Sequence, residues 1–267
     1  MAIIALMTDF GMKDGNVGVM KGVIWGICPH AQISDLSHMI GAQNIREASL
    51  ILSRSAPYFP KGTVHVVVVD PGVGTARRPM AAKIGDWFYV GPDNGTITLL
   101  LERAEKENWS CKFVQLDQTK YWLSNVSYVF HGRDIFSPVA AHLANGVPLS
   151  DLGTEFNNPV RLQLPQPQRM NNGWRGEIIH IDHFGNLTSN IRIENLGDAV
   201  QKKDKVTVKM NGIEIKGMVN TFGERAEGEV IALVGSTGNL IVSVVNGNAA
   251  VELGVKIGDW IEAIVST

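Results

Sequence analysis

An aspartate and an arginine seven residues apart have the types and spacing that chemistry could use. Asp70 directly follows the run Val64-His-Val-Val-Val-Val, and Arg77 lies beyond a turn with two glycines. Such a run predicts a strand buried on both faces of a parallel sheet, and open α/β sheets bind ligands beyond the carboxyl ends of their strands. An arginine near a carboxylate keeps it ionised and can hold a water between the two groups. The alternative is a strand-end aspartate that caps a turn, with Arg77 as a surface charge.

Two further aspartates and a histidine are candidates near other predicted element ends. Asp9 and Asp14 follow the apolar run 3–7, where a carboxylate could bind the hydroxyls of a ribose. Because no G-x-G-x-x-G sequence follows this run, the pattern favours a nucleoside over a nucleotide. A pair of capping aspartates is the alternative, above all for Asp14. His131 precedes a predicted helix and is either a catalytic group or an ordinary satisfied histidine.

Two turns in the C-terminal third could contact a flat ring and a carboxylate. Phe184, Gly185 and Asn186 follow a predicted strand, so the aromatic ring could stack on a base and the amide could bond to its edge. Ser236 begins a Ser-Thr-Gly-Asn sequence whose hydroxyl and N–H donors could bind a carboxylate. Taken singly, each sequence is more typical of an ordinary turn.

The spacing of apolar residues predicts the elements that would position these groups. Strands at 3–7, 32–35 and 64–69 alternate with two helices, the first capped by Asp14 and the second spanning 44–56. This βαβαβ pattern requires a parallel sheet with right-handed crossovers. We therefore expect an α/β fold, with an N-terminal α/β/α domain and a mainly parallel sheet over residues 1–163.

The composition changes at residues 164–173, where prolines, glutamines and asparagines indicate a linker. The segments that follow are typical of strands, with an Asn211-Gly212 hairpin signal and further glycine turns. We expect a C-terminal all-β, barrel-like domain over residues 174–267.

The composition excludes several classes of function. The chain has 267 residues and a formal net charge of −2, which gives no electrostatic footprint for nucleic acid or for an anionic membrane surface. Its two cysteines, Cys28 and Cys111, lie far apart, so neither a zinc site nor a disulfide framework is indicated. No signal peptide or membrane span is recognisable, so we expect a cytoplasmic protein. Since no metal-binding cluster is indicated either, we expect no bound metal.

Four motifs, in this order, together resemble those of the S-adenosyl-L-methionine (SAM) hydroxide adenosyltransferases. They are Thr8-Asp-Phe-Gly11, Val69-Asp-Pro-Gly-Val-Gly-Thr75, Phe130-His-Gly-Arg-Asp134 and Asp182-His-Phe-Gly-Asn186. Members of that family are SAM hydrolases related to the bacterial SAM-dependent fluorinase and chlorinase. The resemblance covers essentially the whole chain and implies an α/β domain followed by a β-barrel.

The resemblance also implies a reaction that needs no cofactor. An activated water attacks the ribose C5′ of SAM and releases adenosine and L-methionine. Asp70, Arg77 and His131 would position and activate this water. The implied substrate-binding residues are Asp9 at the ribose, with Asp14 close by in the sequence, Phe184 and Asn186 at adenine, and Ser236 near the methionine carboxylate. The implied assembly is a homotrimer with SAM at the subunit interfaces.

Departures within the family bear on the choice of reaction. The halogenases carry a tyrosine where Asp70 stands and lack the matched arginine and histidine, so this chain has the hydrolase set. The fluorinase has an arginine beside the methionine carboxylate where this chain has Thr237, which leaves carboxylate binding open. The alternatives are a non-catalytic SAM or nucleoside sensor, which would need no water-activating group, and a SAM-dependent halogenase.

Overall fold

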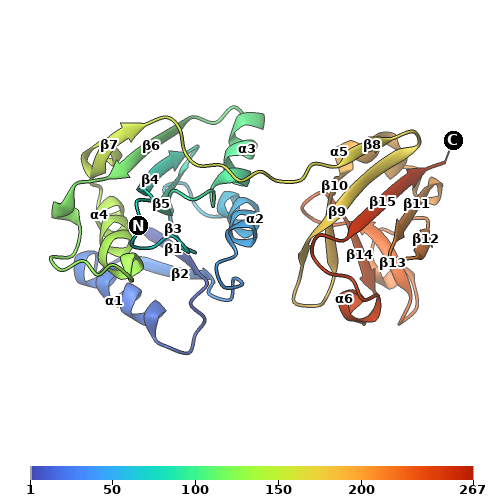
Figure 1. The fold of residues 1–267 in the computed structure, drawn as a ribbon, viewed down its shortest axis with the longest axis horizontal. Coiled ribbons are helices and arrows are strands. Elements are labelled where there is room, and N and C mark those ends of the chain that lie inside the picture. The colour runs from blue at the N-terminus through green and yellow to red at the C-terminus, as the bar shows by residue number, and fades with distance from the viewer. Residues whose placement is uncertain (1, 267) are drawn as a thin grey trace. The chain divides into compact units, whose positions relative to one another are not determined.

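The computed structural model describes residues 2–266, and the chain forms two compact units (Figure 1). The boundary between the units falls between Leu162 and Gln163. Among the described residues, no helix has the length and apolar character needed to cross a membrane.

The first unit is built on a seven-stranded sheet with the strand order β2-β1-β3-β5-β4-β6-β7. Neighbours run parallel from β2 to β5 and antiparallel from β5 to β7. The strands are β1 (Ile3–Thr8), β2 (Gln32–Ser37), β3 (Val64–Val68), β4 (Pro79–Ile84), β5 (Trp87–Pro92), β6 (Cys111–Leu116) and β7 (Gly153–Phe156). The expected α/β fold is confirmed, and the β4–β5 hairpin begins the antiparallel half of the sheet.

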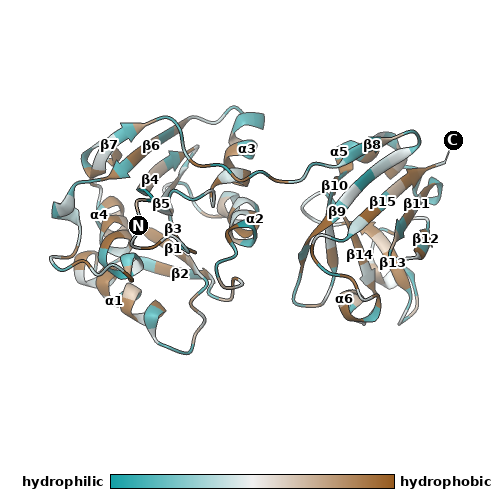
Figure 2. Ribbon diagram, in the orientation of Figure 1, coloured by the Kyte–Doolittle hydropathy of each residue, from teal (hydrophilic) through white to brown (hydrophobic). Residues whose placement is uncertain are grey.

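Helices cover both faces of this sheet. The side chains of β3 are apolar on both faces, so each face must be buried under a helical layer. Val66 and Val68 pack in one core with α1 (Asn16–Ile27) and α4 (Ser137–Ala144). Val67 packs in a second core with α2 (Ile45–Ser55) and α3 (Thr98–Lys106), which carry both hydrophobic and hydrophilic residues (Figure 2). Short turns of helix complete the unit: η1 (Ala56–Tyr58), η2 (Thr119–Tyr121), η4 (Leu149–Leu152) and the π-helical η3 (Gly132–Phe136).

The second unit is an antiparallel sheet with the order β12-β11-β15-β9-β10-β14-β13, and β8 pairs with β9. Its strands are β8 (Gln168–Met170), β9 (Gly173–Ile181), β10 (Leu187–Arg192), β11 (Val206–Met210), β12 (Ile213–Lys216), β13 (Val230–Val234), β14 (Asn239–Val244) and β15 (Trp260–Val265). Its helical turns are α5 (Ile193–Leu196), α6 (Ala249–Glu252), η5 (Gly197–Val200), η6 (Lys203–Lys205) and η7 (Phe222–Glu224). Val219, just after β12, donates its N–H to Ala232 of β13, which nearly closes the sheet. The expected barrel-like domain is confirmed.

Two local expectations are wrong. Asp14 does not cap α1, because the N-cap residue is Gly15, which has a left-handed φ of 72° and leaves Asp14 exposed. The segment 164–173 is not all linker, because Gln168–Met170 forms β8 and pairs with β9 across a two-residue turn at 171–172. The asparagines that suggested a linker are hairpin-turn residues here.

His65 in β3 makes the first unit sensitive to acid. The residue is 1% exposed, its ring lies edge-on to Phe59, and neither ring nitrogen has a hydrogen-bond partner among residues 2–266. Burial lowers the pKa of His65 to about 4, from an ordinary 6.5. The folded protein therefore binds fewer protons than the unfolded chain between these two pKa values, and acid favours unfolding there.

We expect the contribution of His65 to stability to be complete above pH 6.5 and to fall by about 3 kcal/mol as the pH drops to 4. The measurement is urea unfolding of the wild type and of His65→Leu between pH 7.5 and 4. The variant should lose about 3 kcal/mol less than the wild type over this range. Equal losses in the two proteins would contradict the assignment.

Candidate active site

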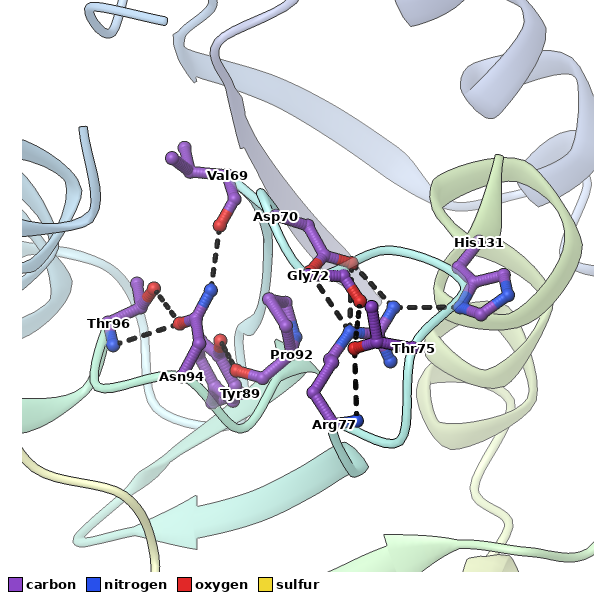
Figure 3. Close-up of polar contacts among 10 residues, drawn as sticks. All are labelled: Val69, Asp70, Gly72, Thr75, Arg77, Tyr89, Pro92, Asn94, Thr96 and His131. Carbon is purple, nitrogen blue, oxygen red and sulfur yellow. Dashed lines mark hydrogen bonds and ion pairs between the residues drawn. The ribbon is translucent and has the colours of Figure 1, made fainter. Parts of the chain in front are cut away.

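Asp70 and Arg77 form a buried ion pair at the carboxyl end of β3 (Figure 3). Arg77 Nε donates to Asp70 Oδ1 and Oδ2 at 2.9 and 3.0 Å, and Nη2 donates to Oδ2 at 2.5 Å. The two side chains are only 4% and 10% exposed. Burial without partners would cost several kcal/mol for each charge. The hydrogen bonds between the guanidinium and the carboxylate offset this cost.

His131 completes the group. Its Nδ1 lies 2.7 Å from Arg77 Nη2, so residues 54 positions apart meet at one guanidinium (Figure 3). A guanidinium can only donate, so Nδ1 is the acceptor and the proton of the neutral ring lies on Nε2. Desolvation and the adjacent Arg77 lower the pKa of His131, outweighing Asp70 and Asp134, which raise it. The imidazole is therefore neutral at pH 7.

The loop between Asp70 and Arg77 reaches the His131 segment because of one glycine. Gly74 has φ 76°, and a Cβ there would overlap the backbone carbonyl oxygen of Tyr128. Thr75 Oγ1 donates to the Gly72 carbonyl at 2.7 Å and accepts from the Arg77 N–H at 3.3 Å (Figure 3). Hydrogen bonds within the loop fix its shape, and Gly74 contacts Tyr128, three residues before His131.

Asp134 anchors the loop that precedes His131. Its carboxylate is fully buried, accepts from the Ser127 N–H at 2.8 Å and pairs with Arg133 at 2.6 Å. Its carbonyl accepts from the Leu123 N–H at 2.9 Å. These contacts tie the 123–131 loop to η3, a π-helical turn, and π-helical turns are frequent at functional sites. His131 is the residue before η3, so its ring position depends on this anchor.

Asp9 emerges at the same edge of the sheet as Asp70, because β1 and β3 are parallel neighbours with Thr8 opposite Val68. Asp9 Oδ2 accepts from the Gln43 N–H at 2.7 Å. The end of β1 is fixed by a buried contact of Thr8 Oγ1 with His38 Nδ1 at 2.9 Å. Asp14, by contrast, is exposed and has no capping role.

The second unit holds the remaining candidates in two turns. Asp182 Oδ1 accepts from the N–H groups of Phe184 and Asn186, both at 2.9 Å, and Asp182 Oδ2 accepts from Asn186 Nδ2 at 2.8 Å. This turn leaves the Phe184 ring 71% exposed. Ser236 is exposed in the turn between β13 and β14, where Arg192 Nη2 approaches the Thr237 carbonyl at 3.4 Å.

Sequence reasoning did not single out Asp134, Asp182 or Asn94 as residues that hold these groups in place. Asp182 had a local signal, since an aspartate followed by a glycine and an asparagine is typical of an Asx turn. Asn94 donates to the carbonyl of Val69, 25 positions away, so its contact leaves no local pattern. The partners of Asp134 are near in sequence, but they lie in an irregular loop and a π-helical turn, which have no sequence periodicity to predict them. Among residues 2–266, no three His, Cys, Asp or Glu side chains gather so as to hold a metal ion.

Comparison with known proteins finds a family model that matches each of the two units. Models described as the SAM hydroxide adenosyltransferase N-terminal and C-terminal domains match residues 4–153 and 176–262. An (R)-S-adenosyl-L-methionine hydrolase of Salinispora tropica is 39% identical, covering 96% of this chain and 95% of that protein. A fluorinase of an Actinoplanes species is 28% identical, covering 90% of each.

A solved structure agrees with these matches. The crystal structure of an uncharacterized conserved protein from Thermotoga maritima superposes with a TM-score of 0.90 at 38% identity, covering 98% of this chain and 99% of that one. With both halves matched in order by the family models, and relatives aligned over nearly the full length, the chain belongs to the SAM hydroxide adenosyltransferase family, which is related to the fluorinases.

Proposed function

We propose that this chain hydrolyses (R)-S-adenosyl-L-methionine to adenosine and L-methionine. The observation that carries the proposal is the contact of Asp70, Arg77 and His131 at one edge of the sheet. The curated hydrolase from Salinispora tropica supports the choice of substrate. Because "L" already describes the amino-acid carbon, "(R)" in that name refers to the sulfonium centre.

The chemistry suits a site of this kind. In the reaction an oxygen–C5′ bond forms, the C5′–sulfur bond breaks with its electron pair moving to sulfur, and the water loses one proton. Sulfur leaves as a neutral thioether, so the leaving group needs no acid. We propose that no metal takes part, since the step requires only a positioned water and a proton acceptor.

We assign Asp70 as the acceptor of the water's proton. Arg77 directs its Nε and Nη2 hydrogens at Asp70 and His131, whereas Nη1 has no partner among residues 2–266 (Figure 3). Nη1 is the donor we propose for the water. The Nδ1 lone pair of His131 is already engaged by Arg77, so the neutral ring orients the guanidinium instead of taking a proton.

Substrate recognition is assigned to the other candidates. We propose that Asp9 binds the ribose hydroxyls, that Phe184 and Asn186 contact adenine, and that Ser236 lies near the methionine carboxylate. The exposed Phe184 ring and its preformed turn support the adenine assignment. Asp14 has no contact that supports a role in binding.

We also propose a homotrimer with the sites at the subunit interfaces. Large apolar side chains exposed close to His131 in the sequence, Tyr128 at 81% and Val129 at 78%, favour a surface that another copy covers. Sedimentation equilibrium should give three times the 29.1 kDa chain mass. A monomer at micromolar concentration would contradict this assembly.

Incubation with the separate (R) and (S) sulfonium epimers, followed by chromatography, tests the reaction. We expect equimolar adenosine and methionine from the (R) epimer. Asp70→Ala should lower kcat by at least about 100-fold, because the proton acceptor is lost, while its affinity for adenosine stays close to that of the wild type. Asn186→Ala is the contrasting variant and should weaken adenosine binding about 10-fold.

Each alternative function has its own experimental signature. Stoichiometric binding of an intact substrate over hours would identify a sensor and overturn the proposed hydrolysis. In a separate incubation, formation of SAM from 5′-chloro-5′-deoxyadenosine and methionine would indicate a halogenase. Near-full turnover by Asp70→Ala would remove this carboxylate from the mechanism.

The pH profile of kcat tests the role of His131. A protonated ring could no longer accept from Arg77, so activity should fall only where His131 gains a proton, below the ordinary value of 6.5. His131→Asn keeps an acceptor oxygen near the position of Nδ1 but cannot titrate. We expect this variant to retain measurable activity without the acid limb seen in the wild type. An unchanged limb in His131→Asn would contradict the assignment.

A further inference from the structure

The Pro92–Asp93–Asn94–Gly95 turn, which begins at the last residue of β5 and leads to α3, contacts the chain on both sides of the Asp70–Arg77 pair. Asn94 Nδ2 donates to the carbonyl of Val69 at 2.9 Å, and Val69 is the residue before Asp70 (Figure 3). Asp93 Oδ2 accepts from Arg78 Nε at 2.8 Å, and the Asp93 N–H donates to the Arg78 carbonyl at 2.9 Å. Consecutive residues of one turn therefore hold the residue before the carboxylate and the residue after the guanidinium.

The amide of Asn94 has one possible orientation. Its Oδ1 accepts from Thr96 Oγ1 at 2.7 Å and from the Thr96 N–H at 3.2 Å, so Nδ2 must face Val69 (Figure 3). Thr96 is fully buried, which shields these bonds from competition by water. The contact with Val69 is thus a defined hydrogen bond and not one of two equivalent amide flips.

The core holds the turn itself in place. Tyr89, 1% exposed, donates its hydroxyl hydrogen to the Pro92 carbonyl at 2.9 Å (Figure 3). A Cβ at Gly91 would lie 2.6 Å from the Tyr89 hydroxyl, so only glycine leaves room for this contact. Asp93 is 3% exposed and also accepts from the Val160 N–H at 2.8 Å. The turn is therefore a rigid support for the strand ends that it contacts.

We propose that Asn94 is a positioning residue for the hydrolysis: it fixes the peptide that joins Val69 to Asp70, while Asp93 fixes Arg78, the residue after Arg77. The inference rests on the proposed function for its catalytic consequence. Neither side chain in this turn needs to touch substrate. Its effect is to set where the carboxylate and the guanidinium meet, and a displacement of about 1 Å in such a group can lower a rate by about 100-fold.

Asn94→Ala tests the proposal, with Asn145→Ala as the matched control. Asn145 Nδ2 also donates to a backbone carbonyl, that of Ile27, at 2.8 Å, in the same unit but after α4. We expect Asn94→Ala to lower kcat for the (R) epimer by 10- to 100-fold with little change in KM, and Asn145→Ala to leave both unchanged. Wild-type kcat in folded Asn94→Ala would overturn the proposal, and so would an equal loss of kcat in the control.

A second readout needs no turnover. Proton NMR titration of the His131 ring reports on the groups that face it, Arg77, Asp70 and Asp134. If Asn94→Ala lets the pair shift, Arg77 moves off the imidazole and the titration midpoint rises toward 6.5, whereas Asn145→Ala leaves it unchanged. An unchanged midpoint in Asn94→Ala would overturn the positioning role. A raised midpoint in a protein that does not hydrolyse SAM would leave the positioning role intact and refute only the proposed function.

Thr96 supplies a milder pair of variants should Asn94→Ala fail to fold. Thr96→Val keeps the side-chain shape but removes the donor to Asn94 Oδ1, and Thr96→Ser keeps that donor. We expect a several-fold loss of kcat in Thr96→Val, at unchanged KM, with most of it recovered in Thr96→Ser. Equal kcat in the two variants would overturn the proposal.

Discussion

The ion pair between Asp70 and Arg77 is the interaction on which the site depends. Two charges this deeply buried are tolerated because each neutralises the other and several hydrogen bonds join them. The pair forms because β3 ends at Val68, two residues before Asp70, and Arg77 lies only seven residues further along the loop. Removing either partner would leave an uncompensated charge in the protein interior, so the contact to which we assign the chemistry also stabilises the strand end.

His131 accepts a hydrogen bond from Arg77 without adding a charge to the Asp70–Arg77 pair. Arg77 bridges an anionic carboxylate and a neutral imidazole, so the three side chains together carry no net charge. A site of zero net charge does not repel a sulfonium cation, although it contains an arginine. The lone pair of the imidazole accepts from the guanidinium, which is why we propose the carboxylate as the base.

Local patterns in the sequence predicted much of this arrangement. The valine run identified β3, because a strand apolar on both faces must lie between two helical layers, and it placed Asp70 at the carboxyl edge of the sheet. The meeting of Arg77 with His131 followed only from resemblance to a family, since nothing local links residues 54 positions apart. No role for Asn94 was predicted, because its partner Val69 is defined by how β3 and β5 lie side by side. Asp14 was misassigned because a glycine in the left-handed region can begin a helix without a side-chain cap.

The close approach of Gly74 to the Tyr128 carbonyl has a consequence for the evolution and engineering of such enzymes. At Gly74 and Tyr128 the segments 71–78 and 123–131 meet backbone to backbone, so no side chain at that point can absorb a change. A chimaera that imports one segment from a relative must import the other as well, and substitutions in the two are expected to show epistasis. New specificity would then arise more readily by exchanging the segments as a matched pair than by mutating either alone.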